Sequence, residues 1–360
     1  MKLQTNFRKF HFISFSFLIL LILFRYLSEL PKYKNGDFVR ISSRVYGEPI
    51  IYDREQYLVL YGLKIYLPKY PEINYGDRII VEGTIKDKKL ESAKLIKIVD
   101  DDGFVYELRQ KLIGFYKSSL PEPFASLVAG ITIGSKNMPA SFWEKLKTTG
   151  TAHVVVASGT NVTMVASFLI SILTYFVSRK RAVFMAIAGI FMYVVLSGFD
   201  APIIRAGIMG SVAFLAQFKG RLVDSYRLLI YSAGIMLLIK PLWILDLGFI
   251  LSFVATLSLM LFQKKIDNEL HFVPNILREG LSTSLAAQIG VAPIIYATFG
   301  AFNILSPLIN ALILWTVAYI MILGAVGGIV GLILPFLGKL ILLIAYPMLL
   351  WFVEIINIFG

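Results

Sequence analysis

One short segment, Ser158-Gly159-Thr160-Asn161, places polar side chains inside an otherwise apolar stretch, shortly after His153. Four poor helix formers in succession disfavour a continuous helix, so we expect unwinding over residues 157–161. Broken membrane helices expose backbone dipoles and often line substrate paths. The alternative is a kink that only allows neighbouring helices to pack closely, and the residues by themselves favour neither interpretation.

A second segment places an acid and a base, Asp200 and Arg205, at the mouth of another apolar stretch, with Pro202 between them. A guanidinium can hold a phosphate through parallel hydrogen bonds, or it can pair with the nearby carboxylate. A structural ion pair between the two is the commoner arrangement.

Further polar side chains lie in the apolar stretches that follow. Ser252 and Thr256 are spaced to share one helix face, and Gln288 lies in the next stretch. Groups of this kind usually join helices through hydrogen bonds. Asn310 follows Pro307 near the start of a long run, where a discontinuous helix would expose its backbone.

Composition excludes several kinds of chemistry. The chain contains no cysteine, so thiolate nucleophiles and Cys-ligated zinc are excluded. Its three histidines, His11, His153 and His271, are not spaced like metal ligands, so we expect no metal and no cofactor. No phosphate-binding loop of the Walker type occurs, so a partner or a gradient must supply energy.

The apolar stretches predict membrane-spanning helices. Hydrophobic residues make up 57% of the 360 residues and charged residues 16%, whereas soluble domains have about 45–50% and about 25%. Continuously apolar runs of about 20 residues cross a membrane as helices, because lipid cannot satisfy free backbone groups. We expect spans at roughly 151–176, 182–198, 203–218, 226–239, 243–262, 282–299, 304–334 and 339–358. The seventh run is too long for one straight span, and its Pro307 and Gly327-Gly328 favour a hidden half-helix.

The N-terminal part of the chain has a different character. The apolar run from Phe10 to about Leu27 has basic residues before it and no small-residue cleavage site after it, so residues 1–33 should form an anchor helix. Residues 34–102 alternate apolar and polar residues, which predicts a small β-barrel of the OB type. Candidate strands are Phe38–Val45, Tyr57–Leu60, Leu63–Leu67, Arg78–Ile85 and Ala93–Val99. The tyrosines of this segment can stack bases, although strand tyrosines more often pack a half-buried face.

Residues 103–150 connect these two parts. Apolar residues recur at helical spacing from Phe104 to Leu120, with Arg109 among the cations between them, which predicts an amphipathic helix at the membrane surface. The stretch Phe124–Ile133 is too short to span and should be re-entrant or interfacial.

Loop charges predict the topology. The net charge is +12, and basic clusters at 179–181, 219–227 and 264–265 fall on every second connection. By the positive-inside rule the N-terminus is cytoplasmic and the domain at 34–102 lies outside. The fold class we expect is a polytopic α-helical membrane protein with an inserted OB-like extracytoplasmic β domain.

Together these segments resemble the membrane domain of the ComEC family, the bacterial inner-membrane channels for DNA uptake. The resemblance is carried by Gly150-Thr-Ala-His153 running into Ala157-Ser-Gly-Thr-Asn161, by Pro202-Ile-Ile-Arg205-Ala-Gly207, by Asp246-Leu-Gly-Phe249-Ile-Leu-Ser-Phe253-Val-Ala-Thr256, and by Ala287-Gln288-Ile-Gly-Val-Ala-Pro293 followed by Phe299-Gly300 and Ser306-Pro307 to Asn310. These blocks occur in the family's order, and family members also carry an external OB-like domain between a first anchor and the channel block.

The resemblance implies that residues 151–360 form a competence (channel) domain that conducts single-stranded DNA across the cytoplasmic membrane. It implies a translocation path at His153, Ser158, Gly159, Asn161, Asp200, Pro202, Arg205, Ser252, Gln288, Pro293 and Asn310. The implied partners are single-stranded DNA, membrane lipids, a cytoplasmic ATPase or helicase, a DNA receptor and a separate nuclease, and a homo-oligomer is left open.

Many relatives append a metallo-β-lactamase-like domain, thought to degrade the strand that is not imported. This sequence lacks that domain, so we expect a naturally short chain or a fragment, and a conduit rather than an enzyme. Two other functions stay open: a membrane enzyme acting on lipid or cell-wall precursors through Asp200, Arg205 and His153, and a small-solute transporter. DNA requires a wide cationic path, whereas an enzyme requires an acid and a base converging in one pocket.

Overall fold

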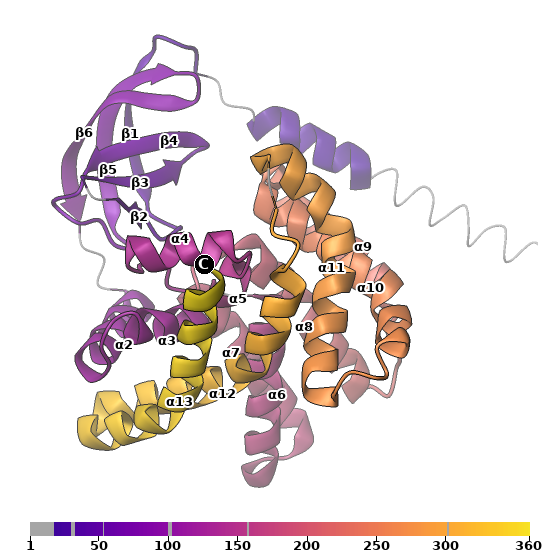
Figure 1. Ribbon diagram of the computed structural model, residues 1–360. Helices are drawn as coiled ribbons and strands as arrows, with labels where there is room; N and C mark the ends of the chain where they lie inside the picture. The colour runs from indigo at the N-terminus through magenta and orange to yellow at the C-terminus, as the bar shows by residue number, and fades with distance from the viewer. Residues whose placement is uncertain (1–17, 30–32, 53, 100–102, 157, 301) are drawn as a thin grey trace, which may run out of the picture.

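The computed structural model describes residues 18–29, 33–52, 54–99, 103–156, 158–300 and 302–360. A helix over residues 18–29 is followed by a sheet domain and then by a block of helices (Figure 1). The predicted anchor run is helical over its described part, and its first residues lie outside the described ranges.

The sheet domain has six strands in the order β1-β5-β6-β4-β3-β2. The strands are β1 (Phe38–Arg44), β2 (Ile50–Ile51), β3 (Glu55–Leu60), β4 (Leu63–Pro68), β5 (Arg78–Lys86) and β6 (Lys89–Val99). Neighbours pair antiparallel except β4 with β6, which are parallel. Alternate residues of β3, β4 and β5 are buried, which gives the domain its own apolar core.

All five predicted strands are present, and the two-residue strand β2 was missed. Two hairpin turns have the left-handed backbone that tight turns require, at Tyr61-Gly62 and at Asp87-Lys88. The edge strands β1 and β2 do not pair with each other in the described ladder, so the sheet is open and the predicted OB-type barrel is not confirmed.

Most tyrosines of the sheet domain lie outside its strands, and several of these are exposed. Tyr75 is buried, but Tyr46, Tyr61 and Tyr70 are more than half exposed. The rings of Tyr57 and Tyr66 lie on opposite strands with their centroids 5.1 Å apart. The domain therefore presents aromatic surface to its surroundings.

Three helices, α2 (Phe104–Ser119), α3 (Phe124–Ile133) and α4 (Ala140–Thr148), connect the sheet domain to the remaining helices. Helix α2 is amphipathic, as predicted: one face, which includes the buried Arg109, packs against α3 and α12, and the other face is exposed. Its place at the membrane surface stays a prediction. All residues of α3 from Ala125 to Ile133 are buried, so this short helix lies inside the protein.

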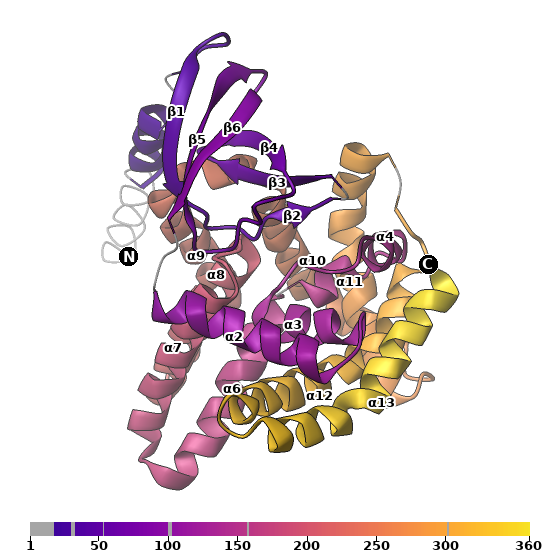
Figure 2. The same ribbon diagram turned by 90° about the vertical axis from the view of Figure 1, so that its left-hand side faces the viewer.

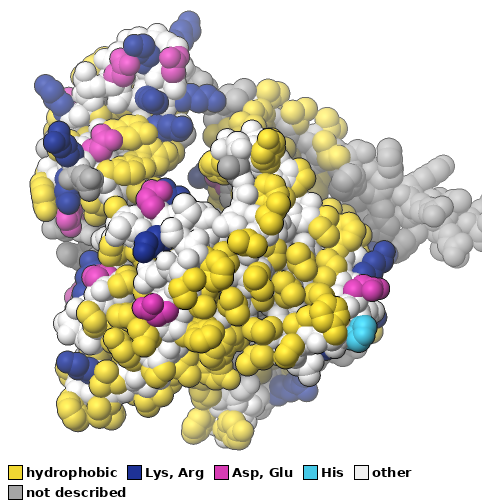
Figure 3. Space-filling model, in the orientation of Figure 1, with side chains coloured by type: hydrophobic (Ala, Val, Ile, Leu, Met, Phe, Trp, Pro, Cys, Tyr) yellow, Lys and Arg dark blue, Asp and Glu magenta, His cyan; other side chains and the backbone are white. Residues whose placement is uncertain are grey.

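The rest of the chain forms the predicted series of long helices, together with the short helices α5 and η1. They are α5 (Ala152–Val155), α6 (Gly159–Phe176), α7 (Arg179–Leu196), α8 (Ala201–Phe218), α9 (Ser225–Ile239), η1 (Pro241–Leu245), α10 (Leu247–Glu269), α11 (Asn275–Phe299), α12 (Ser306–Ile333) and α13 (Pro335–Phe359). Within the described part of the chain, six helices are long and apolar enough to cross a membrane. Figure 3 shows apolar side chains over much of the helical block, whereas charged side chains gather on the sheet domain. The protein is a multi-pass membrane protein.

The seventh run is a single continuous helix, so the prediction of a hidden half-helix is wrong. Its glycines serve packing instead. A Cβ at Gly328 would lie 2.3 Å from the hydroxyl oxygen of Tyr116, and one at Gly331 would lie 2.1 Å from the ring of Phe115. The glycines therefore let the aromatic side chains of α2 approach the backbone of α12.

The long helices that carry the predicted path residues pack against one another. Helix α6 packs on α7 and α8, α8 on α10, α10 on α11, and α11 on α12, which also touches α6. The hairpin of α6 and α7 extends away from the sheet domain (Figure 2).

Candidate functional site

The predicted break is present. Helix α5 ends at Val155 and α6 begins at Gly159, with extended backbone at Val156 and Ser158. The predicted extent is wrong, because Gly159, Thr160 and Asn161 form the first turn of α6 and the interruption lies before them. Poor helix formers are tolerated there, since the first backbone N–H groups of a helix have no intrahelical partner.

Asn161 fixes the break to the buried helix α3. Its side chain is fully buried, accepts a hydrogen bond from the Ser158 hydroxyl at 3.1 Å, and donates one to the backbone oxygen of Ile131 at 3.1 Å. The polar residues of this segment therefore hold the interrupted helix in one conformation.

Gly159 brings the break against the first turns of α8. A Cβ at this position would lie 2.9 Å from Nη2 of Arg205 and 3.3 Å from Cβ of Ala206. The absence of a side chain thus allows the guanidinium to lie over the start of α6. Two segments that are more than 40 residues apart in the sequence meet here.

Arg205 lies within a candidate membrane span and has no carboxylate partner among the described residues. Its Nε donates to Oγ of Ser252 at 2.7 Å, its Nη1 lies 3.5 Å from the sulfur of Met209, and its Cζ lies 5.9 Å from the centre of the Phe253 ring. Neutral groups therefore position a charge that nothing in this part of the protein neutralises.

The alternative of an ion pair between Asp200 and Arg205 is wrong. The Asp200 carboxylate pairs with Nζ of Lys136 at 2.9 Å, and Asp200 itself precedes the first residue of α8. Pro202 occupies the first turn of α8, where its missing N–H costs nothing.

A second polar cluster joins α11 and α12 to the segment before α5. Gln288 donates to the backbone oxygen of Asn303 at 3.2 Å, and Asn303 donates to that of Thr148 at 2.8 Å. Asn310 donates to Ser284 at 2.9 Å, while its own buried Oδ1 has no hydrogen-bond partner among the residues that the structure describes.

The remaining predicted path residues lie apart from these contacts. His153 is exposed, and its Nδ1 lies 3.0 Å from the backbone oxygen of Gly150. Pro293 lies inside α11 and is exposed. The structure thus brings together Ser158, Gly159, Asn161, Arg205 and Ser252, and places the rest around them.

A row of hydroxyl side chains on α6 escaped the sequence analysis. The row lies on the face of α6 opposite to the buried Val162 and Ala166, and every member is exposed. It consists of Thr160, Thr163, Ser167, Ser171 and Thr174. Their spacing of three or four residues was the signal that could have revealed them.

A buried charge cluster under the sheet domain also escaped prediction. Glu48 lies between β1 and β2, and its Oε2 is 3.0 Å from Nη2 of Arg109 on α2. Arg109 also donates to the backbone oxygens of Ile133 and Leu196. Its position on one helix face with Leu112 and Tyr116 was the signal that it would be buried.

Tyr75 completes the contact between the sheet domain and the helices. Its hydroxyl donates to the backbone oxygen of Val195 at 2.7 Å, and its ring centre lies 5.1 Å from Cζ of Arg109. Burial raises the pKa of the Tyr75 phenol above its ordinary value. The sheet domain is therefore docked onto the ends of α3 and α7, next to the start of α8.

Known proteins share much of this chain. A family model described as "Competence protein" matches residues 131–360, which include all of the predicted path residues. ComE operon protein 3 of Bacillus subtilis (strain 168) is 28% identical over 230 residues, covering 62% of this chain and 29% of that protein. An uncharacterized protein of Aquifex aeolicus (strain VF5) is 28% identical over 174 residues, covering 48% of this chain and 39% of that protein. The matched regions thus span less than two fifths of either relative, and no solved structure matches.

Proposed function

Because this chain belongs to the ComEC-type competence protein family, we propose that its helical block is the channel that conducts single-stranded DNA across the cytoplasmic membrane. The family supports a role in DNA uptake during competence.

Arg205 carries the proposal. A cation inside a membrane span is costly, so it persists where it serves a function. Here the guanidinium is held by Ser252 and the ring of Phe253 rather than by an acid. Because Asp200 is already paired with Lys136, the charge of Arg205 is free to attract a phosphodiester, which a planar guanidinium binds through two parallel hydrogen bonds.

The broken helix and the hydroxyl row supply the rest of the path. At the break between α5 and α6, any backbone group without an intrahelical partner must meet protein or water rather than lipid. The exposed hydroxyls from Thr160 to Thr174 continue from that point along α6. Such side chains offer hydrogen bonds without charge, which suits a polyanion that must bind briefly and then move on.

We place the sheet domain outside the cytoplasm, where it meets DNA first. Basic residues lie at the opposite ends of these helices, in the first turn of α7 and between α8 and α9. The exposed tyrosines of the sheet domain provide aromatic faces on which unpaired bases can stack, and Nζ of Lys69 lies 5.8 Å from the ring centre of Tyr70. A cytoplasmic ATPase or helicase, a DNA receptor and a nuclease are the partners that this function requires.

The alternative of a membrane enzyme has no support from the contacts of its three candidate residues. Asp200 pairs with Lys136, Arg205 is bound to Ser252, and His153 contacts the backbone of Gly150. We therefore favour a conduit over an acid–base site.

The test is DNA uptake in a competent host that carries variants of the full gene. Arg205→Gln should lower the entry of labelled DNA into a DNase-resistant form by about 10- to 100-fold, as expected from losing a hydrogen bond to a charged group. Arg205→Lys should retain part of the uptake, because it keeps the charge but not the planar fork.

Arg227→Gln is the matched control, since Arg227 is exposed and pairs with Asp224 near the start of α9. Its uptake should stay at the wild-type level. Normal uptake by Arg205→Gln at normal abundance in the membrane would show that Arg205 does not hold DNA. A defect of that variant in cell-wall or lipid synthesis with normal uptake would favour the enzyme.

A further inference from the structure

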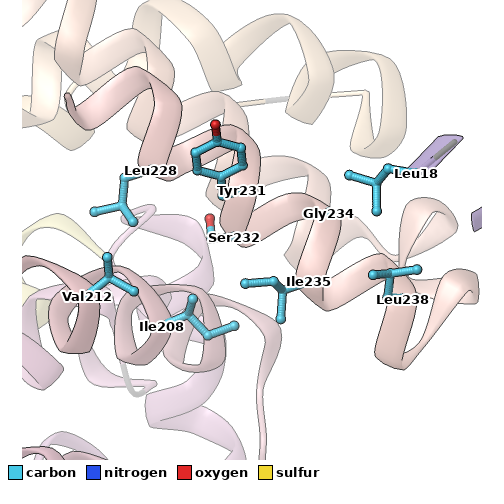
Figure 4. A pocket seen from close by; sticks show the side chains of 9 residues that line it. All are labelled: Leu18, Ile208, Val212, Leu228, Tyr231, Ser232, Gly234, Ile235 and Leu238. Carbon is cyan, nitrogen blue, oxygen red and sulfur yellow. The ribbon is translucent and has the colours of Figure 1, made fainter. Parts of the chain in front are cut away.

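An apolar crevice of about 350 Å³ opens between α8 and α9 (Figure 4). Its walls include Ile208 and Val212 from α8 and Leu228 and Ile235 from α9, and Leu18 of the N-terminal helix lies at one end. Two wall residues carry hydroxyls: that of Ser232 is bonded to the backbone oxygen of Leu229 at 2.8 Å, and that of Tyr231 belongs to an exposed side chain. The other side chains of the walls are apolar, so the crevice suits a hydrocarbon chain.

Helix α9 is short for a membrane span, which brings the Leu228 end of this crevice close to the membrane surface. Its 15 residues span about 22 Å, which is shorter than the ~30 Å hydrocarbon core. Basic residues that flank a short span reach toward the lipid headgroups, so we place the connection from Lys219 to Asp224 at that level. A second apolar crevice of about 330 Å³ separates the other side of α9 from α10, so α9 has apolar space on both flanks.

The connection between α8 and α9, beyond the residues that line the crevice, carries two basic side chains. Lys219 follows Ile208 by 11 residues, or three helical turns, and so continues the face of α8 that lines the crevice. Arg221 lies two residues further on, and both are exposed. Neither has an ion-pair partner among the described residues, whereas Arg227 pairs with Asp224.

We propose that this crevice is a binding site for an anionic phospholipid, with one acyl chain between α8 and α9 and the phosphate at Lys219 and Arg221. The two halves of the site match the two halves of such a lipid. Hydrocarbon fills a groove that would otherwise leave apolar side chains without contacts, and the basic pair attracts the phosphate. The site is independent of the channel, because it lies on the α9 side of α8 whereas Gly159, against which Arg205 lies, belongs to α6.

Retention of lipid by the purified full-length protein tests this site. The protein is exchanged into detergent micelles with equal amounts of phosphatidylglycerol and phosphatidylcholine of the same acyl chains, and native mass spectrometry counts the retained lipids. The wild type should retain phosphatidylglycerol preferentially. Lys219→Gln with Arg221→Gln should lower the ratio of the two lipids by roughly ten- to thirtyfold, from the usual attraction per basic residue.

Lys264→Gln with Lys265→Gln removes the same charge near the end of α10 and should leave the ratio unchanged. Arg221→Lys should also retain it. Val212→Phe fills the crevice without changing charge and should reduce retention of phosphatidylglycerol, and glycerol phosphate, which lacks acyl chains, should not displace the lipid.

Equal ratios for the Lys219/Arg221 and Lys264/Lys265 variants would overturn the proposal. Because all four side chains lie at or near helix ends, neither variant disturbs the packed interior. Unchanged retention in Val212→Phe would show that the lipid is held at the surface by charge and does not enter the crevice, which also contradicts the site proposed here.

Discussion

Replacing Glu48 by glutamine removes the carboxylate that neutralises a buried guanidinium. The side chain of Arg109 is 1% exposed and that of Glu48 is 12% exposed, and their charged groups are 3.0 Å apart. After the substitution Arg109 keeps the backbone oxygens of Ile133 and Leu196 but has no counterion. Glu48→Gln therefore leaves an uncompensated charge between the sheet domain and the helices.

The size of the effect follows from this burial. Removing one partner of a buried ion pair costs about 3–5 kcal/mol, because the remaining charge stays out of water. Roughly 2 °C of melting temperature is lost per kcal/mol in a large chain, so we expect a decrease of roughly 6–10 °C. Glu48→Gln combined with Arg109→Met removes both charges, and it should cost less than the sum of the two single substitutions by more than about 1 kcal/mol.

Thermal unfolding in detergent micelles, followed by the fluorescence of the four tryptophans, measures these differences. The control is Glu91→Gln in the same domain, because Glu91 makes an exposed pair with Lys86 at 3.1 Å. Exposed pairs contribute about 0–1 kcal/mol, so the control should melt within about 2 °C of the wild type.

Two results would contradict the predicted stabilisation by the Glu48–Arg109 pair. If Glu48→Gln melts no lower than Glu91→Gln, the pair with Arg109 does not hold the sheet domain on the helices. If the double variant loses as much as the two single variants together, the two side chains act independently and the short distance between them has no energetic meaning.

Two further predictions concern the path and the topology. Gly159→Ala should lower DNA uptake at least about tenfold at normal abundance, since its Cβ would lie 2.9 Å from the Arg205 guanidinium. Gly210→Ala, whose Cβ would lie 4.0 Å from the nearest side chains, should leave uptake unchanged. Equal uptake by the two variants would contradict the role of this contact. Because the chain lacks cysteine, Lys88→Cys should react with an impermeant thiol reagent from outside and Lys180→Cys only after permeabilisation, and the reverse pattern would invert the proposed topology.

Local patterns determined the elements of this fold. The apolar runs predicted each of the long helices, because their length reflects the thickness of a membrane. The turns at Tyr61-Gly62 and Asp87-Lys88 were also predicted, and so was an interruption of the helix near Ser158, although it was expected to extend to Asn161. These features depend on the conformational preferences of a few adjacent residues. The sheet order was not predicted, and the open edge of β1 is visible only in three dimensions.

The partners of the charged residues were decided by the tertiary structure. Asp200 lies five residues from Arg205 but pairs with Lys136, 64 residues away, and Glu48 reaches Arg109 across 61 residues. A local pattern shows that a charge is near an apolar stretch, but not which side chain comes within reach when the helices pack. Because the electrostatic energy of a charge depends on its distance to every neighbour and on its burial, the free cation of the proposed path, Arg205, could be identified only once the chain had folded around it.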